Sequence, residues 1–514
     1  MISKLLTLVN TAKFLKPIQI GYRLYYFSRS RWRKLKKFRY PTALVSQPAI
    51  LNLQLSLSSS PSYSGKTFTF LNITHTFDGA IDWNFPEYGK LWTYNLTYFD
   101  FLQQEGVSRE EGLILIHDFI NQITTIKDGL EPFPISLRGI NWIKFLTYQN
   151  IKEQVIDDNL YAQYVILLDN LEYHLLGNHL LENAFSLLFG AYYFQDDILY
   201  NKAKAILIAE LSEQILDDGA HFELSPMYHQ IMLFRVLHCI NLVQSNPWKQ
   251  DELLLFLEGK AAKMLGWLEA ISYSDGSIPH FNDSTDGIAP TTQQLIKYAN
   301  NLKLSTKSST LSACGYRKIV KADYECVVDI GQIGPSYIPG HAHADTFNFE
   351  LRIAGLPFIV DTGLSTYEIG KRRDFERGTS AHNTIVVSGQ NSSDVWGGFR
   401  VAERADIVAL EESSESIKAT HNGYKKLGIV HTRTFEFYNH KILISDELNK
   451  DVEAKAYLHF HPTVSEASIK KYILLEAGEF KIKIYEYAEG FNKYASAKYL
   501  EIDFQRNLNI EITL

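Results

Sequence analysis

The stretch Pro339–Gly363, PGHAHADTFNFELRIAGLPFIVDTG, decides how the second half of the chain is interpreted. Its apolar residues Phe347, Phe349, Leu351 and Ile353 alternate with other residues, which is typical of a strand with one buried face. The same stretch carries titratable side chains at the mouth of this predicted sheet: His341, His343, Asp345 and Asp361. The sequence therefore predicts a polar site at one end of a buried sheet.

From about Leu311 to the C-terminus the chain consists of short β-rich runs separated by turns, such as CVVDIGQI, HNTIVVSG, HTRTFEFY and FKIKIYEY. Many strands without helices between them favour an antiparallel arrangement in two packed layers. We predict an antiparallel β-sandwich over residues 309–514.

Residues 106–308 have a different period, because their apolar residues recur at three- and four-residue spacing. This pattern predicts serial helices, including helices at 226–244, 251–272 and 291–303. Short connections between them indicate an all-α domain built from helical hairpins arranged in an arc. Residues 1–105 are expected to form an N-terminal arm and first helices that pack on this domain. The chain is thus a multidomain α+β protein.

The composition limits the function classes. With 514 residues, a net charge of −7 and 13% aromatic residues, the chain has no overall attraction to nucleic acid, and its aromatic side chains suit stacking on sugar rings. Residues 23–40 are the exception, since this basic segment could contact an anionic surface or polymer. We favour a solvated basic face on a helical arm. Three scattered cysteines indicate a reducing compartment.

Polar residues cluster at two places in the helical half. In GNHLLENAF, the four polar side chains Asn178, His179, Glu182 and Asn183 lie at spacings that put His179 with Glu182 and Asn183 on one helix face. In FELSPMYH, Ser225-Pro226 predicts a helix start, so that Tyr228 lies in the first turn, where the helix dipole lowers the pKa of a phenol. The alternatives are purely structural roles: helix-end capping for the first cluster and a tyrosine packed in the core for the second.

Three further residues have the chemistry of a metal site. His343, Asp361 and His382 form a two-histidine, one-carboxylate set, which suits Zn²⁺ with one open position. A cationic loop, KRRDFERGTSAHN, precedes His382 and carries Arg373 and Arg377, whose guanidinium groups suit carboxylate or sulfate recognition. A polar loop at 275–287 is rich in Asp and Asn, so calcium binding is one alternative, but we expect a solvated loop close to a cleft.

Several motifs together resemble the heparinase II/III-like polysaccharide lyases, which are related to alginate and oligoalginate lyases. The resemblance covers most of the chain and rests on these segments: LWTYNLTYFDFL, EPFPISLRGINW, GNHLLEN, FELSPMYH, GHAHADTFNFEL, LPFIVDTG and AHNTIVV. It implies an incomplete (α/α) toroid followed by an antiparallel β-sandwich, with an acidic polysaccharide in the cleft between them.

The resemblance also implies roles for individual residues. The implied catalytic residues are Asn178, His179, Tyr228 and His341. The implied ligands of a mainly structural zinc ion are His343, Asp361 and His382. The expected substrate contacts are Glu182, which matches an acidic residue near the substrate carboxylate in some members, and His229, Arg373, Arg377 and Asn383.

The implied reaction is β-elimination at a uronic acid. The substrate carboxylate must be neutralised by Asn178, by a protonated Glu182 or by a nearby arginine before a base can take the C5 proton. Tyr228 can serve as base and acid if its pKa falls toward neutrality, and His179 is the other candidate base. The resemblance to shorter relatives links the reaction to bacterial surface-polysaccharide production rather than to degradation.

Two rival functions are weighed against this lyase. One is a glycoside hydrolase of toroid shape using two carboxylates among Asp217, Asp218, Glu223 and Asp275. The other is a non-catalytic polysaccharide-binding or assembly protein. We further expect no transmembrane segment, a homodimer, and a cytoplasmic location, with the periplasm or another export route as the alternative.

Overall fold

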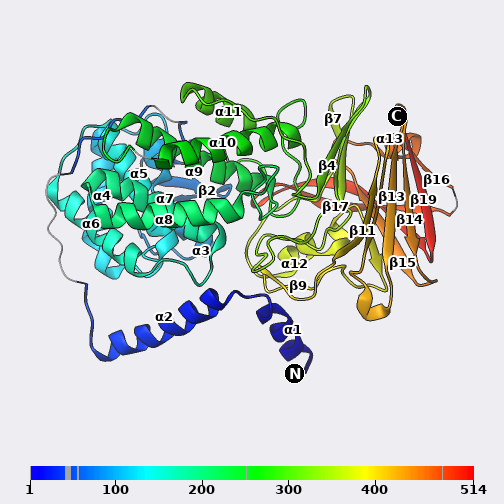
Figure 1. Cartoon of the computed structure of the whole chain (residues 1–514), viewed down its shortest axis with the longest axis horizontal. Helices are drawn as coiled ribbons and strands as arrows, with labels where there is room; N and C mark the ends of the chain where they lie inside the picture. The colour runs from blue at the N-terminus through cyan, green and yellow to red at the C-terminus, as the bar shows by residue number, and fades with distance from the viewer. Residues whose placement is uncertain (1, 41–47, 55–56, 251, 477) are drawn as a thin grey trace.

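A computed structural model describes residues 2–40, 48–54, 57–250, 252–476 and 478–514. Helices dominate the first part of the chain and antiparallel strands the second, as Figure 1 shows from left to right. The last helix of the helical part ends at Asn301 and the first strand of the β part begins at Tyr316, so the predicted boundary at 308/309 falls between them.

The helical part is built from consecutive helices. Its helices are α3 (Lys90–Tyr98), α4 (Arg109–Gln122), α5 (Pro132–Tyr148), α6 (Gln154–Asp169), α7 (Gly177–Phe194), α8 (Asp197–Gln214), α9 (Pro226–Ser245), α10 (Glu252–Ile271) and α11 (Thr292–Asn301). The predicted helices at 226–244, 251–272 and 291–303 are confirmed as α9, α10 and α11.

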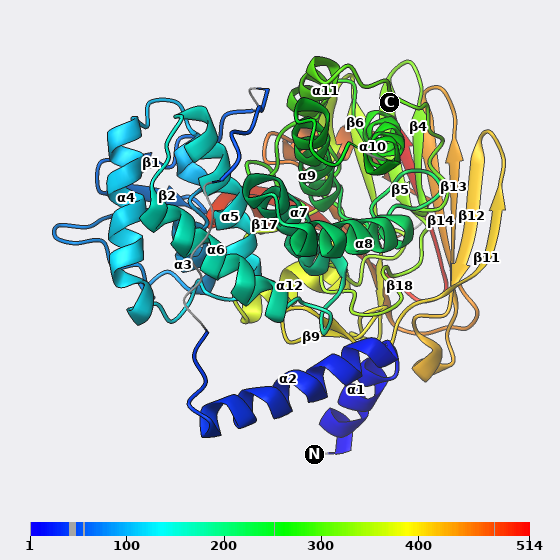
Figure 2. The same ribbon diagram turned by 60° about the vertical axis from the view of Figure 1, so that its left-hand side comes forward.

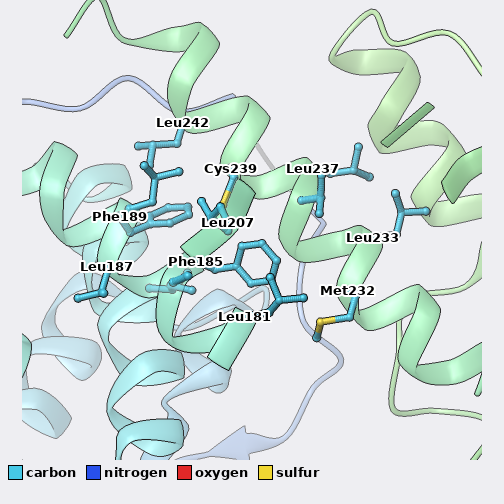
Figure 3. Close-up of a cluster of buried hydrophobic side chains, with 14 of the residues drawn as sticks. Leu181, Phe185, Leu187, Phe189, Leu207, Met232, Leu233, Leu237, Cys239 and Leu242 are labelled. Atoms are coloured by element: carbon cyan, nitrogen blue, oxygen red, sulfur yellow. The ribbon is translucent and has the colours of Figure 1, made fainter. Parts of the chain in front are cut away.

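Helix α7 is the centre of this part, because almost every side chain along it is buried. A helix that is apolar on all sides belongs in the interior of a large domain. Figure 3 shows Leu181 and Phe185 of α7 packed in one cluster with Leu207 of α8 and with Met232 and Leu237 of α9. The polar residues at the start of α7 are thus held on a rigid, buried element.

The N-terminal segment contains more than helices. Helices α1 (Ile2–Ala12) and α2 (Pro17–Leu35) form an arm, as expected, but a small antiparallel sheet then follows, made of β1 (Tyr63–Ser64), β2 (Thr67–Phe70) and β3 (Ile73–Thr76). This sheet was not part of the expectation for residues 1–105. Phe68 and Phe70 of β2 are buried, and Phe70 packs edge-on against Trp92 of α3, which explains why the sheet forms here.

The β part contains three antiparallel sheets that build the sandwich. One sheet has the order β11 (Ile407–Glu412), β12 (Ser416–His421), β13 (His431–Phe437), β14 (Lys441–Leu448), β19 (Asn507–Thr513), β16 (Ile473–Leu475). The second has the order β17 (Phe480–Gly490), β18 (Lys493–Phe504), β15 (Ala454–His459), β8 (Ile385–Val387), and the third runs β4 (Tyr316–Val320), β5 (Tyr324–Asp329), β6 (Phe349–Ile353), β7 (Leu356–Ile359). A short pair, β9 (Val395–Trp396) with β10 (Arg400–Val401), and the helices α12 (Lys371–Arg377) and α13 (Glu466–Tyr472) complete it.

The stretch Pro339–Gly363 contains two of these strands, β6 and β7. Strand β6 begins at Phe349 rather than Phe347, because Phe347 has a positive φ of 71° that turns the chain before the strand. Phe349 then packs against Phe435 of β13 with ring centroids 5.6 Å apart, which joins two sheets across the core. The turn leaves His341 and His343 outside the sheet, facing the helical part.

The two parts of the chain meet where the segments 280–286 and 339–345 run together. The backbone N–H of Asp283 donates to the carbonyl of His341 at 3.1 Å, and the N–H of His343 donates to the Asn282 side-chain oxygen at 2.9 Å. These bonds fix the histidine segment of the β part against a loop of the helical part.

Among the described residues, no helix combines the length and the apolar character needed to cross a lipid bilayer. The predicted compartment and the predicted homodimer stay predictions.

Candidate active site

Asn178 stands at the N-terminus of α7, held by a buried carboxylate. Glu223 accepts hydrogen bonds from the Asn178 backbone N–H at 3.1 Å and from its Nδ2 at 2.8 Å. Gly177, at φ +59°, makes this approach possible, since a Cβ there would lie 2.9 Å from the Glu223 carboxylate. Burial alone would raise the pKa of Glu223, but His221, His341 and the Asn178 donors lower it, so Glu223 is ionised.

His341 reaches this point from the β part. Its Nδ1 lies 2.8 Å from Asp283 Oδ2, so its Nε2 faces Asn178 Nδ2 at 3.3 Å and Glu223 Oε2 at 3.8 Å. The Tyr228 ring stacks on the imidazole with centroids 3.9 Å apart and planes inclined by 30°. The structure therefore brings together three of the four predicted catalytic residues.

Tyr228 is placed by the start of α9. Ser225 is the N-cap and its Oγ accepts the Tyr228 backbone N–H at 3.2 Å, which confirms the predicted helix start at Pro226. The Tyr228 hydroxyl lies 3.1 Å from the Tyr367 hydroxyl. Burial raises the pKa of Tyr228 well above that of a free phenol, although the Tyr367 contact acts in the opposite direction. This direction is opposite to the fall toward neutrality on which a role of Tyr228 as base depends, because burial raises the pKa of its hydroxyl.

Ser225 does more than cap α9, because its hydroxyl also donates to the Asp283 carbonyl at 2.7 Å. We expect Ser225→Ala to lower the free energy of unfolding by about 1–2 kcal/mol, measured by urea denaturation. Ser465→Ala is the matched control, since Ser465 caps the short exposed helix α13 and should cost about 0.5–1 kcal/mol. Equal losses in the two variants would show that the bond to Asp283 contributes nothing.

His179 is adjacent to Asn178 in the chain but has its own carboxylate partner. Its Nδ1 lies 3.1 Å from Glu172 Oε1, while the other Glu172 oxygen accepts Asn183 Nδ2 at 2.9 Å. Burial lowers the pKa of His179, but Glu172, with a smaller effect of Glu223, outweighs burial and raises it. The His179 side chain is 41% exposed, against 12% for His341, so it is the more accessible of the two imidazoles.

Glu182 lies one turn further along α7 and is buried. Both of its carboxylate oxygens accept from Arg235 Nε, at 3.0 and 3.1 Å. Burial raises the pKa of Glu182, and Arg235 opposes this shift. Glu182 therefore lies beneath the site in an ion pair, and its predicted contact with substrate finds no support in this geometry.

Asp283 is a site residue that was not predicted from the sequence, as are Glu172 and Tyr367. Each of its carboxylate oxygens contacts one histidine and one guanidinium nitrogen: Oδ1 meets His343 Nε2 at 2.8 Å and Arg373 Nη1 at 2.5 Å, and Oδ2 meets His341 Nδ1 at 2.8 Å and Arg373 Nη2 at 2.7 Å. Burial favours the neutral acid, but Arg373 and the two histidines hold the pKa of Asp283 well below its usual range. The 275–287 loop was expected to be solvated, yet Asp283 is fully buried.

Four predicted substrate contacts are instead buried and bonded within the protein. Arg373 pairs with Asp283, and Arg377 donates to the Ala342 carbonyl at 2.8 Å. Asn383 donates to the carbonyls of Phe349 and Val360 at 2.8 and 2.9 Å. His229 bonds the Met264 carbonyl at 3.0 Å, and burial lowers its pKa to about 3. These side chains hold the site's framework, and the geometry does not support direct contact with substrate.

The three predicted zinc ligands lie near one another in the β part. Asp361 Oδ2 lies 2.7 Å from His382 Nδ1, and the His343 and His382 ring centroids are 5.3 Å apart. His343 Nδ1, His382 Nε2 and Asp345 Oδ2 are buried and have no hydrogen-bond partner. In the part of the chain that the structure describes, no three His, Cys, Asp or Glu side chains are arranged to hold a metal ion together. The unpaired nitrogen atoms nevertheless have the chemistry of zinc donors.

Comparison with known proteins decides the family. The heparinase II/III N-terminus model matches residues 141–310, and the heparinase II/III-like C-terminal model matches residues 304–498. The chain belongs to the heparinase II/III-like family. It is 23% identical over 319 residues to a heparin-sulfate lyase of Bacteroides stercoris, covering 56% of this chain and 46% of that protein. It is 28% identical over 218 residues to a heparin-sulfate lyase of Pedobacter heparinus, covering 36% of this chain and 32% of that protein.

This heparinase II/III-like chain thus spans about half or less of the length of the curated relatives it matches. A crystal structure of heparinase III superimposes with a TM-score of 0.64 at 16% identity, covering 97% of this chain and 91% of that one. At that identity the likeness concerns the fold. It confirms the predicted (α/α) toroid followed by an antiparallel β-sandwich.

Proposed function

We propose that this heparinase II/III-like protein is a polysaccharide lyase that cleaves a uronate-containing polysaccharide by β-elimination. The observation that carries the proposal is the meeting of Asn178, Tyr228 and His341 at the junction of the two domains. The names of its heparin-sulfate lyase relatives support the same class of activity and make a sulfated, uronate-containing glycan the first substrate to test.

Tyr228 is assigned the role of general acid. Because burial raises its pKa, the phenol stays protonated at neutral pH and has a proton to donate. In β-elimination the C5–H electrons form the C4–C5 double bond as the C4–O bond breaks. The leaving oxygen then takes the Tyr228 proton.

His179 is assigned the role of base. Its Nδ1–H donates to Glu172, which leaves the Nε2 lone pair for the C5 proton, and the nearby carboxylates raise its basicity. Asn178 and His341 then lie where the substrate carboxylate can be hydrogen-bonded as charge develops on it. Asp283 positions His341 by fixing its Nδ1.

The assignment of His179 predicts a pH effect. Glu172 raises the pKa of His179, so Glu172→Gln should lower it, and the acidic limb of kcat/KM should move to lower pH because a neutral base is needed. The measurement is the pH profile of initial rates. Glu447→Gln, on an exposed position of β14, is the matched control and should leave the profile unchanged. If the acidic limb of the kcat/KM profile does not move in Glu172→Gln, His179 is not the base.

Zinc is proposed as a structural metal, held by His343, Asp361 and His382. The two unpaired buried ring nitrogens support this assignment, and the ion would supply charge compensation and rigidity beside the active site. We expect elemental analysis of the purified protein to find zinc, and Asp361→Asn to reduce it together with the melting temperature. The assignment would be contradicted if the purified protein contained no zinc and a chelator did not change its melting temperature.

The test of the activity itself is ultraviolet absorbance of the new C4–C5 double bond on a panel of heparan sulfate, hyaluronan, alginate and the producing cell's own surface glycan. Rising absorbance establishes elimination. New reducing ends without absorbance would support the hydrolase, and binding without cleavage would support the non-catalytic alternative. The geometry disfavours the hydrolase, because Asp218 accepts backbone N–H groups of Ser312 and Cys314 and Asp275 pairs with Arg352.

A further inference from the structure

The arm formed by residues 2–40, which contains α1 and α2, has a composition unlike the rest of the chain. It carries eleven Lys and Arg residues and no Asp or Glu, whereas the remaining residues carry 40 Lys and Arg against 58 Asp and Glu. Among the described residues, ten of the 26 large hydrophobic side chains that are exposed lie between Leu8 and Phe38. A basic charge and exposed apolar surface therefore coincide on one short segment.

One face of α2 attaches the arm to the body. Gln19 donates to the Leu175 carbonyl at 2.9 Å, Tyr26 donates to the Leu171 carbonyl at 2.5 Å, and Arg29 pairs with Asp169 at 2.9 Å. The three attached positions are spaced by seven and three residues, which puts them on one side of the helix. The rotation of α2 about its own axis is thereby fixed.

The opposite face carries what we call the outer stripe: Ile20, Leu24, Phe27 and Leu35. The spacings of four, three and eight residues place these side chains in one line along the helix. They are 45%, 63%, 56% and 83% exposed, respectively. Figures 1 and 2 show α2 along one edge of the molecule, and the exposure of these side chains shows that the body does not cover this face.

Basic residues surround the outer stripe. The Arg31 guanidinium lies 4.1 Å from the Phe27 ring centroid, Lys34 lies on the last turn of α2, and the exposed Lys36, Lys37 and Arg39 follow it. Trp32, exposed by 58%, lies on the flank of the stripe. Leucine and aromatic side chains beside Lys and Arg on one helix are the combination that inserts into the boundary between lipid headgroups and acyl chains.

We propose that the outer face of α2 binds the surface of an anionic phospholipid bilayer, with the outer stripe in the acyl boundary and the basic residues on the headgroups. A helix bound in this way lies in the plane of the interface and does not cross the membrane. The attachment through Gln19, Tyr26 and Arg29 places the body on the aqueous side of α2.

A bilayer fits this face better than an acidic polysaccharide does. A polysaccharide would pair with the cations but would leave Leu24, Phe27 and Leu35 in water. The arm's cations that suit a soluble anion lie instead on its inner side, where Arg23, Arg29 and Arg33 line a cavity of about 470 Å³ against the toroid.

The experiment is flotation of the full chain with vesicles of phosphatidylcholine alone and of phosphatidylcholine mixed with phosphatidylglycerol. We expect binding to the anionic vesicles, weakened by salt because exposed charges are screened. The triple variant Leu24→Ser/Phe27→Ser/Leu35→Ser should bind at least tenfold more weakly. Its matched control is Leu255→Ser/Val408→Ser/Ile484→Ser, which removes comparably exposed hydrophobic residues elsewhere and should bind normally.

A second variant, Arg31→Gln/Lys34→Gln, should reduce both the binding and its dependence on salt. Circular dichroism and the melting temperature show whether each variant is folded. The proposal is overturned if the chain does not bind anionic vesicles, or if the triple variant Leu24→Ser/Phe27→Ser/Leu35→Ser binds them as well as the natural chain does. Two further outcomes would overturn it. The first is a dimer that the triple variant abolishes, with no binding to vesicles, which would show that the outer stripe serves self-association. The second is binding of the arm to an acidic polymer and not to vesicles.

Discussion

Replacing Tyr228 by phenylalanine is expected to reduce the rate of double-bond formation by about 10²–10⁴-fold, the usual contribution of a positioned general acid. The variant keeps the ring that stacks on His341 and loses only the hydroxyl that contacts Tyr367. Substrate affinity should change little, because the loss falls on kcat. The measurement is single-turnover absorbance on the best substrate of the panel.

Tyr367→Phe is the matched control for Tyr228→Phe. It removes the other hydroxyl of the same hydrogen bond, and a single such bond is worth about tenfold at most. Losses of equal size in both variants would mean that the hydrogen bond between the two hydroxyl groups matters, and not proton donation by Tyr228. If Tyr228→Phe forms the double bond at the same rate as the natural chain, Tyr228 is not the general acid.

Replacing Asp283 by asparagine is expected to lower the free energy of unfolding by about 3–5 kcal/mol and to abolish most activity. The variant leaves Arg373 buried with no carboxylate, and it frees the His341 ring to change its orientation. Urea denaturation measures the first effect and single-turnover kinetics the second. Both losses should appear at the same position although Asp283 need not touch the substrate.

The double variant Asp283→Leu/Arg373→Met separates the two effects. Because both charges are removed together, its free energy of unfolding should be closer to that of the natural chain than that of Asp283→Asn. Its activity should stay low, since His341 still lacks its partner. A stable and fully active double variant would show that Asp283 does not position His341.

The fold could be predicted from periodicity and order. The helical spacing at 226–303 and the alternation around Phe349 gave the correct types of element, and the change of period near Leu311 gave the order of the two domains. The small sheet at 63–76 escaped prediction because its strands are only two to four residues long. Such runs give too little alternation to distinguish them from loop.

The candidate site was predicted in part. Asn178, Tyr228 and His341 were found because their motifs are local, and the structure brings them together. Asp283 was missed because an aspartate among polar neighbours signals a loop, and only tertiary contacts with His341, His343 and Arg373 reveal its burial. The burial of Arg373 and Arg377 could not be predicted for the same reason, since a cationic loop is expected to face solvent until its partners are known.

The contacts of Asp283 also constrain how members of this family can be recombined. Its carboxylate belongs to the helical half, while the two imidazoles and the guanidinium that it binds belong to the β half. A chimera that exchanges toroids to alter substrate preference would separate the two sides of this buried cluster if the crossover were placed at the apparent domain boundary between Asn301 and Tyr316. A crossover between residues 276 and 280 keeps the loop with its sandwich, and this junction should give folded hybrids where the apparent domain boundary does not.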